Sequence, residues 1–335
     1  RTKQKYDSHG TRKNGGAMNI SIVIVNYNTR DLLLSCLKSI SKFFPSKTEI
    51  VVIDNASSDD SVQALKKPYP QVKIIKNVSN LGFAKACNQG IKVAQGALIF
   101  LVNSDIEFVD RSFEKAVEYL EENPDCGLVG PKLLNTDGSL QPSAFAQFPN
   151  FATTLAENGL TGQIMNKLLP DMKRPGKYLY SNSSHEKTLR PAHVGGALMI
   201  FKKKVWERVD GLDERFFMFR EETDFCKKIS DRGLEIIYLP TFSVFHHQIT
   251  SIKIQGLHKK LRLYFRSVYL YHAKYYGRIS QIILYLLNTL KFAINLLFYV
   301  IFVTILKVLM LKKIAGKLNW YLLYNYLSLR VHLLI

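Results

Sequence analysis

Ile20-Ser-Ile-Val-Ile-Val25 is followed directly by Asn26-Tyr-Asn-Thr29, and these two segments decide the fold class. Six almost continuously apolar residues are typical of a strand that is buried on both faces of a sheet. The polar turn leads into apolar residues that recur at helical spacing between Leu32 and Ile40. A buried strand that feeds a helix is the first half of a β-α-β unit.

The same alternation continues along the chain. Apolar runs predict three more strands, at 50–53, 72–75 and 97–102. Ser57–Asp60 provides the start of a short helix that runs to about Lys66, and a helical pattern predicts another helix at 83–94. Strands that alternate with helices predict an α/β fold with a doubly wound, mostly parallel sheet. The second half is less regular, and it predicts long loops over 135–192, helices over 203–209 and 222–232, and a strand over 236–239 followed by loop and short strand.

Length and composition narrow the class of protein. A chain of 335 residues with 47% hydrophobic content can bury one large core or two modest ones. A mean hydropathy of −0.03 argues against a polytopic membrane protein, and the four cysteines form no metal-binding or CxxC spacing. We therefore expect reduced thiols in a cytosolic chain. Residues 1–17 are polar and aperiodic, and we expect them to be disordered or vector-derived ahead of Met18.

The positive charge is concentrated at the C-terminal end. Thirteen Lys and Arg residues and no Asp or Glu follow Glu235, so this segment carries +13 of the net charge of +19. It is also apolar, and 17 of the 20 residues over 292–311 are hydrophobic. This composition suits an anionic membrane surface better than a nucleic acid. We expect 253–335 to be a helical membrane-associating tail that lies in the interface, with a spanning helix or a soluble helical subdomain as alternatives.

Polar residues follow three of the predicted strands where each one ends. They are Asn26-Tyr27-Asn28, Asp54-Asn55 and Asn103-Ser104-Asp105. The carboxyl ends of parallel strands meet at one edge of a sheet, so we expect a ligand site there. The first turn holds no glycine, and the chain contains neither a GxGxxG motif nor a P-loop. This argues against a dinucleotide-dependent oxidoreductase, an NTPase and a nucleotidyltransferase.

A diphosphate bound without a glycine-rich cradle needs another counter-charge. A divalent cation held by one or two carboxylates supplies it, and Asp105 is the leading candidate ligand. The structural alternative for Asp105 is the N-cap of a following helix. His246 follows a predicted strand and is the candidate second protein ligand.

Three acids open the predicted helix at Glu221-Glu222-Thr223-Asp224. Their mutual repulsion raises the pKa of at least one carboxyl group, which suits a general base. The apolar stretch Phe216–Phe219 precedes them and lowers the local dielectric. The structural alternative is favourable interaction with the helix dipole.

Together these segments resemble the family-2 glycosyltransferases, and most of all the bacterial rhamnosyltransferase-like subgroup. The resemblance covers about residues 18–251, and each motif is unspecific alone while the ordered set is specific. The motifs are Asn26–Asn28, Val52–Asp59, Asn80–Ala84 with Asn88, Asn103–Asp105, Gly195-Gly196, Gly211–Asp213, Glu221–Cys226 and His246. The resemblance implies a GT-A domain over 18–252 and an inverting, metal-dependent transfer from a nucleotide-sugar donor.

The resemblance also implies roles for single residues. Donor binding falls to Asn26, Tyr27, Asn28, Asp54, Asn80, Gly82, Phe83, Asn88, Asn103, Ser104, Gly195 and Gly196, with Gly82 allowing a close backbone approach to the donor. Asp105 stands at the last position of the family's Asp-x-Asp motif and, with His246, would hold Mg²⁺ or Mn²⁺. Glu222 aligns with the catalytic base, Glu221 adjoins it, and Asp224 orients the site.

Two positions depart from the family pattern, and neither removes a required group. Ser104 stands where the subgroup often has proline. Lys228 stands where the family usually has arginine, so a phosphate contact there would lose its bidentate geometry.

The implied function is transfer of rhamnose from dTDP-rhamnose to a lipid-linked glycan in bacterial cell-wall and surface polysaccharide synthesis. A polyprenyl-diphosphate-linked acceptor would explain a membrane-associating tail at the cytoplasmic face of the membrane. UDP-hexose or UDP-N-acetylhexosamine donors use the same framework and stay open, as does an inactive sugar-nucleotide-binding member of the family. Nucleic acid is not an expected partner, and an oligomer is compatible with the sequence.

Overall fold

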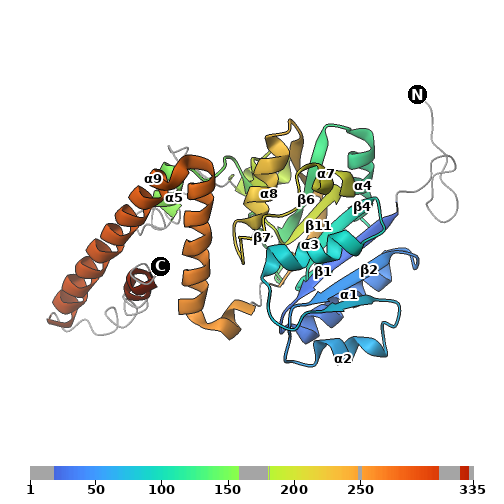
Figure 1. The fold of residues 1–335 in the computed structure, drawn as a ribbon, viewed down its shortest axis with the longest axis horizontal. Helices are drawn as coiled ribbons and strands as arrows, with labels where there is room; N and C mark the ends of the chain where they lie inside the picture. Colours follow the sequence, from blue (N-terminus) through green and yellow to red (C-terminus); the bar gives the residue numbers. More distant parts are fainter. Residues whose placement is uncertain (1–18, 158–179, 181, 248–250, 309–324, 332–335) are drawn as a thin grey trace.

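The computed structural model describes residues 19–157, 180, 182–247, 251–308 and 325–331. A large sheet covered by helices forms one part, and two long helical arms from the C-terminal segment stand beside it (Figure 1). The predicted N-terminal extension, residues 1–17, lies outside the described residues.

The first half of the sheet follows the predicted order of elements. These are β1 (Ile20–Asn26), α1 (Arg30–Phe43), β2 (Glu49–Asp54), α2 (Ser61–Lys66), β3 (Lys73–Lys76), α3 (Phe83–Val93) and β4 (Leu98–Asn103). β1 lies parallel to β2 on one side and to β4 on the other. Asn26 is opposite Asp54, and Val25 is opposite Asn103, so the three strand ends lie together.

The second half makes the sheet mixed. Its elements are β5 (Ile106–Phe108), α4 (Phe113–Glu122), β6 (Cys126–Leu134), β7 (Leu140–Gln141), β8 (Ala144–Phe145), α5 (Phe151–Glu157), η1 (Asn182–Glu186), β9 (His193–Val194), β10 (Leu198–Lys202), α7 (Lys203–Arg208), α8 (Glu221–Ser230) and β11 (Glu235–His246). The strand order is β3-β2-β1-β4-β10-β6-β11-β5, and β10 runs antiparallel to both of its neighbours. The predicted loop after residue 239 is wrong, because β11 continues to His246 through a register shift between Leu239 and Ser243 that accommodates Pro240.

The core consists of two apolar layers on opposite faces of the sheet. Ile22 and Ile24 of β1 face one layer, and Val23 and Val25 face the other. This explains the nearly continuous apolar run, because every side chain of the strand is buried. The four cysteines are free and buried, in agreement with the predicted reduced thiols.

The C-terminal segment forms α9 (Ser251–Val308), which is broken where Gly256 and Gly277 have φ of +76° and +84°. We call residues 257–276 the first arm and residues 278–308 the second arm. The first arm stands next to the sheet, and the second arm turns back from the end of the first arm and diverges from it at an angle (Figure 1). Phe265 of the first arm packs in a small core with residues of the second arm and with α5. The predicted helical tail is confirmed for the described residues.

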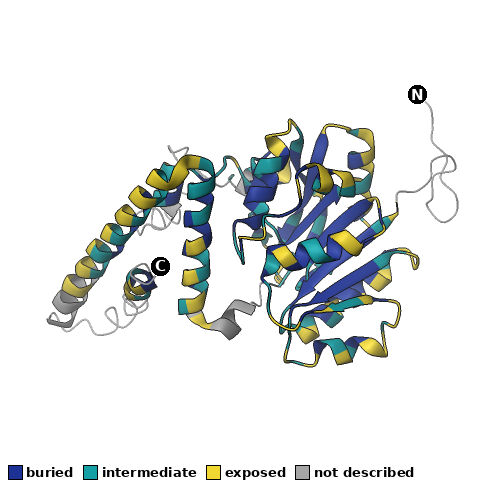
Figure 2. Cartoon of the chain, viewed as in Figure 1, coloured by how far each residue is buried: buried dark blue, intermediate teal, exposed yellow. Residues whose placement is uncertain are grey.

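The second arm has many exposed residues along its length (Figure 2), and the large apolar ones among them recur at helical spacing. They are 37–76% exposed and comprise Ile279, Ile282, Ile283, Leu286, Leu287, Leu290, Ile294, Leu297, Phe298 and Ile301. A contiguous apolar surface of this kind marks an interaction site. Among the described residues, His258–Phe298 is long and apolar enough to cross a membrane by length and composition alone, although Gly277 breaks it.

Candidate active site

A pocket opens at the carboxyl ends of β1, β2 and β4. Its lining comprises Val25, Tyr27, Thr29, Asn55, Asn80, Gly82, Phe83, Asn103, Ser104, Asp105, Phe217 and Met218. Six of the residues assigned to the donor and one assigned to the metal are therefore brought together here. Thr29, Phe217 and Met218 belong to the lining although the sequence analysis did not place them in the site.

Asn26 and Asp54 lie beneath the pocket and are not part of its lining. The Asn26 amide donates to Asp54 Oδ1 at 3.1 Å and to Ser57 Oγ at 3.0 Å, and its Oδ1 accepts from Thr29 Oγ1 at 2.7 Å. Asp54 is 1% exposed, and its Oδ2 accepts from the Ser57 backbone N–H. Both side chains use their polar atoms within the protein, so they hold the pocket wall.

Asn28 is also engaged by its neighbours. Its φ is +54°, and its Oδ1 accepts from the backbone N–H of Ser58 at 2.7 Å. Its own backbone N–H donates to Ser57 Oγ at 3.0 Å. The side chain therefore joins the β1–α1 turn to the loop after β2.

Asn55 is the central polar residue of the pocket wall, and the sequence analysis noted it without assigning it a role. Its Nδ2 donates to Asn80 Oδ1 at 2.9 Å and to the Gly82 carbonyl at 3.1 Å. Its Oδ1 accepts from the Leu81 backbone N–H at 3.0 Å and from Asn77 Nδ2 at 3.1 Å. Asn55 thereby fixes the loop that carries Asn80, Gly82 and Phe83 into the pocket.

The backbone conformation and the close packing at position 82 require a glycine. Its φ is +87°, and a Cβ at this position would lie 2.7 Å from the carbonyl oxygen of Phe217. The Phe83 backbone N–H donates to that same carbonyl at 2.6 Å. The loop that precedes α8 therefore accounts for glycine at position 82, and the predicted close approach of Gly82 to the donor stays a prediction.

The Gly82→Ala variant is expected to be less stable than the Gly138→Ala variant. Gly138 has a similar φ of +79°, but a Cβ there meets nothing within 4 Å, so its replacement costs about 1 kcal/mol. Gly82→Ala adds the clash with Phe217, which costs about 1–3 kcal/mol more. Urea unfolding of both variants measures the difference, and equal losses of unfolding free energy would contradict this account.

Asn88 lies outside the pocket, and the donor contact predicted for it is not supported by its geometry. Its Nδ2 donates to the Leu212 carbonyl at 2.8 Å. Its Oδ1 accepts from Trp206 Nε1 at 3.0 Å and from the Leu212 N–H at 2.9 Å. The side chain fixes the Gly211 turn to α3. Lys228 supports the same turn by donating to the Gly211 carbonyl, so it does not stand ready for a phosphate.

Gly195 and Gly196 connect the strand ends with the acidic helix. The Gly195 N–H donates to the Ser143 carbonyl at 2.8 Å, and a Cβ on Gly196 would lie 3.0 Å from Glu222 Cβ. The next carbonyl, that of Ala197, accepts from the Asn103 N–H at 2.9 Å. Neither glycine lines the pocket, and both serve to bring Glu222 close to the end of β4.

Asp105 and His246 face each other at the pocket edge. The distance from Asp105 Oδ1 to His246 Nε2 is 3.4 Å. β5 begins directly after Asp105, so the alternative of a helix N-cap is wrong. His246 Nδ1 lies 2.6 Å from Gln141 Oε1, while Gln141 Nε2 donates to Asn135 Oδ1.

This hydrogen bonding prepares His246 to act as a ligand. Gln141 Oε1 can accept a proton from Nδ1 of His246, and in that tautomer the Nε2 lone pair is turned toward Asp105. Two acceptors at this distance suit a cation between them. Among the described residues no cluster of three or more His, Cys, Asp or Glu side chains is arranged to hold a metal, so further ligands would come from the substrate or water.

The acidic start of α8 is largely buried. Burial raises the pKa of the Glu221 carboxyl well above its usual range, and the charge of Glu222 adds to this shift. Burial likewise raises the pKa of Glu222, while the Arg220 guanidinium opposes the shift. Burial is therefore a larger cause of the raised pKa values than the predicted repulsion among the acids. Thr223 Oγ1 donates to Glu222 Oε1 at 3.0 Å and orients it.

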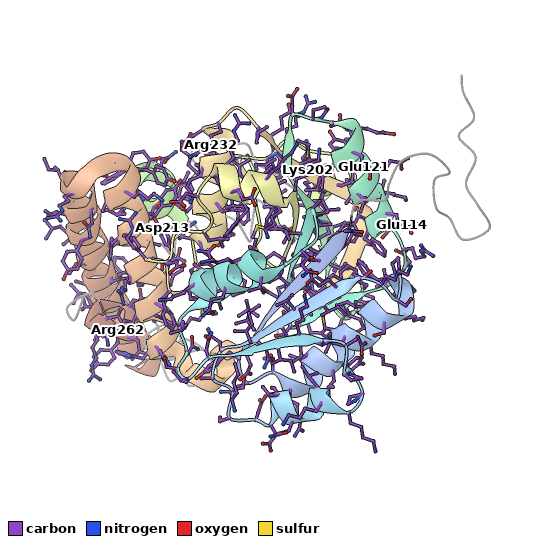
Figure 3. The ribbon with its side chains drawn as sticks, turned by 45° about the vertical axis from the view of Figure 1, so that its right-hand side comes forward. Glu114, Glu121, Lys202, Asp213, Arg232 and Arg262 are labelled. Carbon is purple, nitrogen blue, oxygen red and sulfur yellow. The ribbon has the colours of Figure 1, made fainter. Side chains whose placement is uncertain are left out.

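Two residues of the first arm reach Asp224, and neither was predicted to belong to the site. Lys274 Nζ lies 2.6 Å from Asp224 Oδ1, and Tyr275 donates to the same oxygen at 2.8 Å. Lys274 also pairs with Asp213 at 2.8 Å, on the side of the domain that faces α9 (Figure 3). The missed signal was the combination of cationic and aromatic residues within a helix that the sequence analysis assigned to the membrane.

The chain is similar to known glycosyltransferases in sequence. The model of glycosyl transferase family 2 matches residues 21–166. N-acetylglucosaminyl-diphospho-decaprenol L-rhamnosyltransferase of Mycobacterium tuberculosis is 26% identical over 244 residues, which cover 69% of this chain and 77% of the relative. The low-salt glycan biosynthesis hexosyltransferase Agl10 of Haloferax volcanii is 26% identical, with 68% of this chain and 67% of the relative covered.

The fold is similar to solved GT-A enzymes. The mannosyltransferase PcManGT of Pyrobaculum calidifontis, in complex with GDP-Man and Mn²⁺, superposes with a TM-score of 0.55 at 16% identity, over 95% of this chain and 86% of that one. GalNAc-T7 with UDP, GalNAc and Mn²⁺ gives a TM-score of 0.51 at 18% identity, over 74% and 48%. Residues 21–166 therefore form a glycosyl transferase family 2 domain, the fold is GT-A, and the chain is rhamnosyltransferase-like in sequence.

Proposed function

We propose that this glycosyltransferase moves rhamnose from dTDP-rhamnose to a polyprenyl-diphosphate-linked glycan and inverts the anomeric configuration. The observation that carries the proposal is the joining of the pocket to the acidic helix, because Glu222 packs on Gly196 beside the strand end that bears Asp105. The named activity of the mycobacterial relative supports rhamnose as the transferred sugar and a lipid-linked acceptor.

The pocket lining suits a nucleotide. Tyr27 and Phe83 offer aromatic surface for a base, and Asn80 and Asn103 offer amide groups for ribose and phosphate oxygens. The side-chain oxygen of Asn103 is buried and has no hydrogen-bond partner among the described residues. We assign these residues to the donor, and we assign Asn26, Asn28 and Asp54 to the support of the pocket wall.

We assign Asp105 and His246 to a divalent cation, Mg²⁺ or Mn²⁺. The facing oxygen and nitrogen acceptors form a donor set that fits either ion. When bound, such an ion neutralises negative charge on the diphosphate leaving group. The two solved GT-A enzymes contain Mn²⁺, which supports this assignment.

Glu222 is the proposed general base. Its carboxylate takes the proton of the acceptor hydroxyl as the acceptor oxygen bonds to the anomeric carbon and the bond to the diphosphate breaks. The attack comes from the face opposite the leaving group, so the configuration inverts through an oxocarbenium-like transition state. The raised pKa strengthens Glu222 as a base, and Asp224 orients the start of its helix.

A panel of nucleotide sugars tests the donor assignment. The full chain is incubated with dTDP-rhamnose, UDP-glucose, UDP-galactose and UDP-N-acetylglucosamine, each with Mg²⁺ or Mn²⁺ and a polyprenyl-diphosphate acceptor. We expect metal-dependent release of dTDP. Release of UDP instead would assign the second donor class, and binding without any release would indicate an inactive sugar-nucleotide-binding member.

We also propose that the second arm of α9 holds the enzyme on the anionic cytoplasmic face of the membrane. Its exposed apolar row gives a helix face suited to the lipid interface. The segment after Glu235 has no acidic residue, and each Lys or Arg near an anionic leaflet contributes about 1 kcal/mol. The predicted boundary between residues 252 and 253 stays a prediction. In this proposal the first arm belongs with the sheet, and only the second arm faces lipid.

The double variant Leu286→Glu with Leu290→Glu is expected to lose most of its binding to vesicles. Both side chains are exposed, and burial of each in lipid contributes about 1.5–3 kcal/mol, so partitioning falls by at least about 100-fold. Flotation with vesicles of anionic phospholipid measures this. Val78→Glu is the control, because Val78 is fully exposed on the sheet domain. Unchanged flotation of the double variant would refute the assignment.

A further inference from the structure

The first arm of α9 presents one face to the turn that leads into the acidic helix. Tyr264, Ser267, Lys274 and Tyr275 are spaced at helical intervals along this face. Ser267 Oγ donates to the Met218 carbonyl at 2.7 Å, and Arg220 Nη2 donates to Tyr264 Oη at 3.2 Å. The arm thus contacts the segment from Met218 to Asp224 at several points and covers its length.

That segment has an unfavourable backbone. Phe219 and Arg220 have φ of +70° and +68°, and two consecutive left-handed residues other than glycine are strained. α8 has no side-chain N-cap to fix its first turn. The conformation therefore depends on contacts from outside the segment, and the first arm supplies several of them.

The Asp224 carboxylate has its partners on the same arm. Asp224 is fully buried, and its Oδ1 receives both Lys274 at 2.6 Å and Tyr275 at 2.8 Å. Lys274 also pairs with Asp213, which follows the Gly211 turn fixed by Asn88. One ammonium group therefore joins the turn after α7 to the first turn of α8. A buried carboxylate that lost this cation would be strongly disfavoured.

We propose that the first arm is a clamp on the catalytic turn, in which Lys274 and Tyr275 are positioning residues that act through Asp224 to hold Glu222. The clamp makes the first arm a working part of the transferase domain, although the sequence placed it in a membrane tail. This inference rests on the proposed role of Glu222 as the base.

Lys274→Met tests the clamp in the full-length chain. We expect kcat to fall by about 100-fold, the loss typical of a displaced catalytic group, while KM for the nucleotide sugar changes little. Lys274→Arg keeps the charge and is expected to recover much of kcat, and Tyr275→Phe gives a smaller loss. Lys291→Met is the matched control, because Lys291 joins α9 to the Leu155 carbonyl, far along the helix from Asp224.

A general loss of stability is separated from loss of positioning by a charge-neutral double variant. Lys274→Met with Asp224→Asn removes the unpaired buried charge, so its thermal midpoint should return toward that of the wild type while kcat stays low. If kcat also returned, Lys274 would only stabilise the fold, and the clamp would be refuted.

Hydrogen exchange makes the test independent of the proposed function. In Lys274→Met the backbone amides of 219–226 should exchange at least about tenfold faster, with no such change in Lys291→Met. If exchange is faster in Lys274→Met but the wild-type chain itself transfers no sugar, the clamp on the turn is supported and the role of Glu222 as a base is rejected. Unchanged exchange together with unchanged kcat would overturn the clamp.

Discussion

Glu222→Gln is expected to lower kcat by about 10²–10⁴-fold while the affinity for the nucleotide sugar changes little. The amide keeps the size of the side chain and its contact with Gly196, but it cannot accept the acceptor's proton. Turnover is followed by nucleotide release, and donor binding by calorimetry. Glu114→Gln is the control, because Glu114 is exposed and remote from the pocket. Near-normal turnover of Glu222→Gln would reject the base assignment.

The pH dependence gives the same prediction a second readout. A general base must be ionised, and burial raises the pKa of Glu222 above the usual 4.5. As the pH falls through this raised pKa the base becomes protonated, so kcat/KM should fall at a higher pH than for an exposed glutamate. The residual activity of Glu222→Gln should lack this acid limb. If kcat/KM of Glu222→Gln fell at the same acidic pH as that of the wild type, another group would be responsible for the fall.

Asp105→Asn is expected to weaken metal-dependent donor binding by more than the 10–100-fold loss that is typical of outer-shell partners of a metal. The substitution removes the negative charge that faces His246 Nε2. Calorimetric titration with a nucleotide sugar, with and without Mn²⁺, measures the effect. Asp110→Asn is the matched control, because Asp110 is exposed in the loop after β5. Unchanged affinity in the presence of Mn²⁺ would contradict the metal assignment.

The sequence predicted the first half of the fold well because its signals are local. β1 to β4 are apolar runs of strand length, and the parallel pairing follows from the helices between them. The second half depends on long-range pairing. β10 enters the sheet between β4 and β6, and β11 passes Pro240 by a register shift, which no short window of sequence indicates.

The location of the site could be predicted from the sequence, but the roles of single polar residues in it could not. Polar residues at strand ends do meet in one pocket, because that follows from the topology of the sheet. Spacing cannot tell whether a polar side chain serves a ligand or the chain itself, so Asn88 was assigned to the donor although it holds the Leu212 backbone. Lys274 was missed because its partner Asp224 lies fifty residues earlier in the sequence.

Direct transfer tests the central claim. The full chain is incubated with radiolabelled dTDP-rhamnose, Mn²⁺ and polyprenyl-diphosphate N-acetylglucosamine in anionic vesicles, with Glu222→Gln in parallel. We predict a labelled glycolipid whose new linkage has the anomeric configuration opposite to that of the donor, and almost none with the variant. A product that retains the configuration, or equal labelling by the variant, would contradict the account.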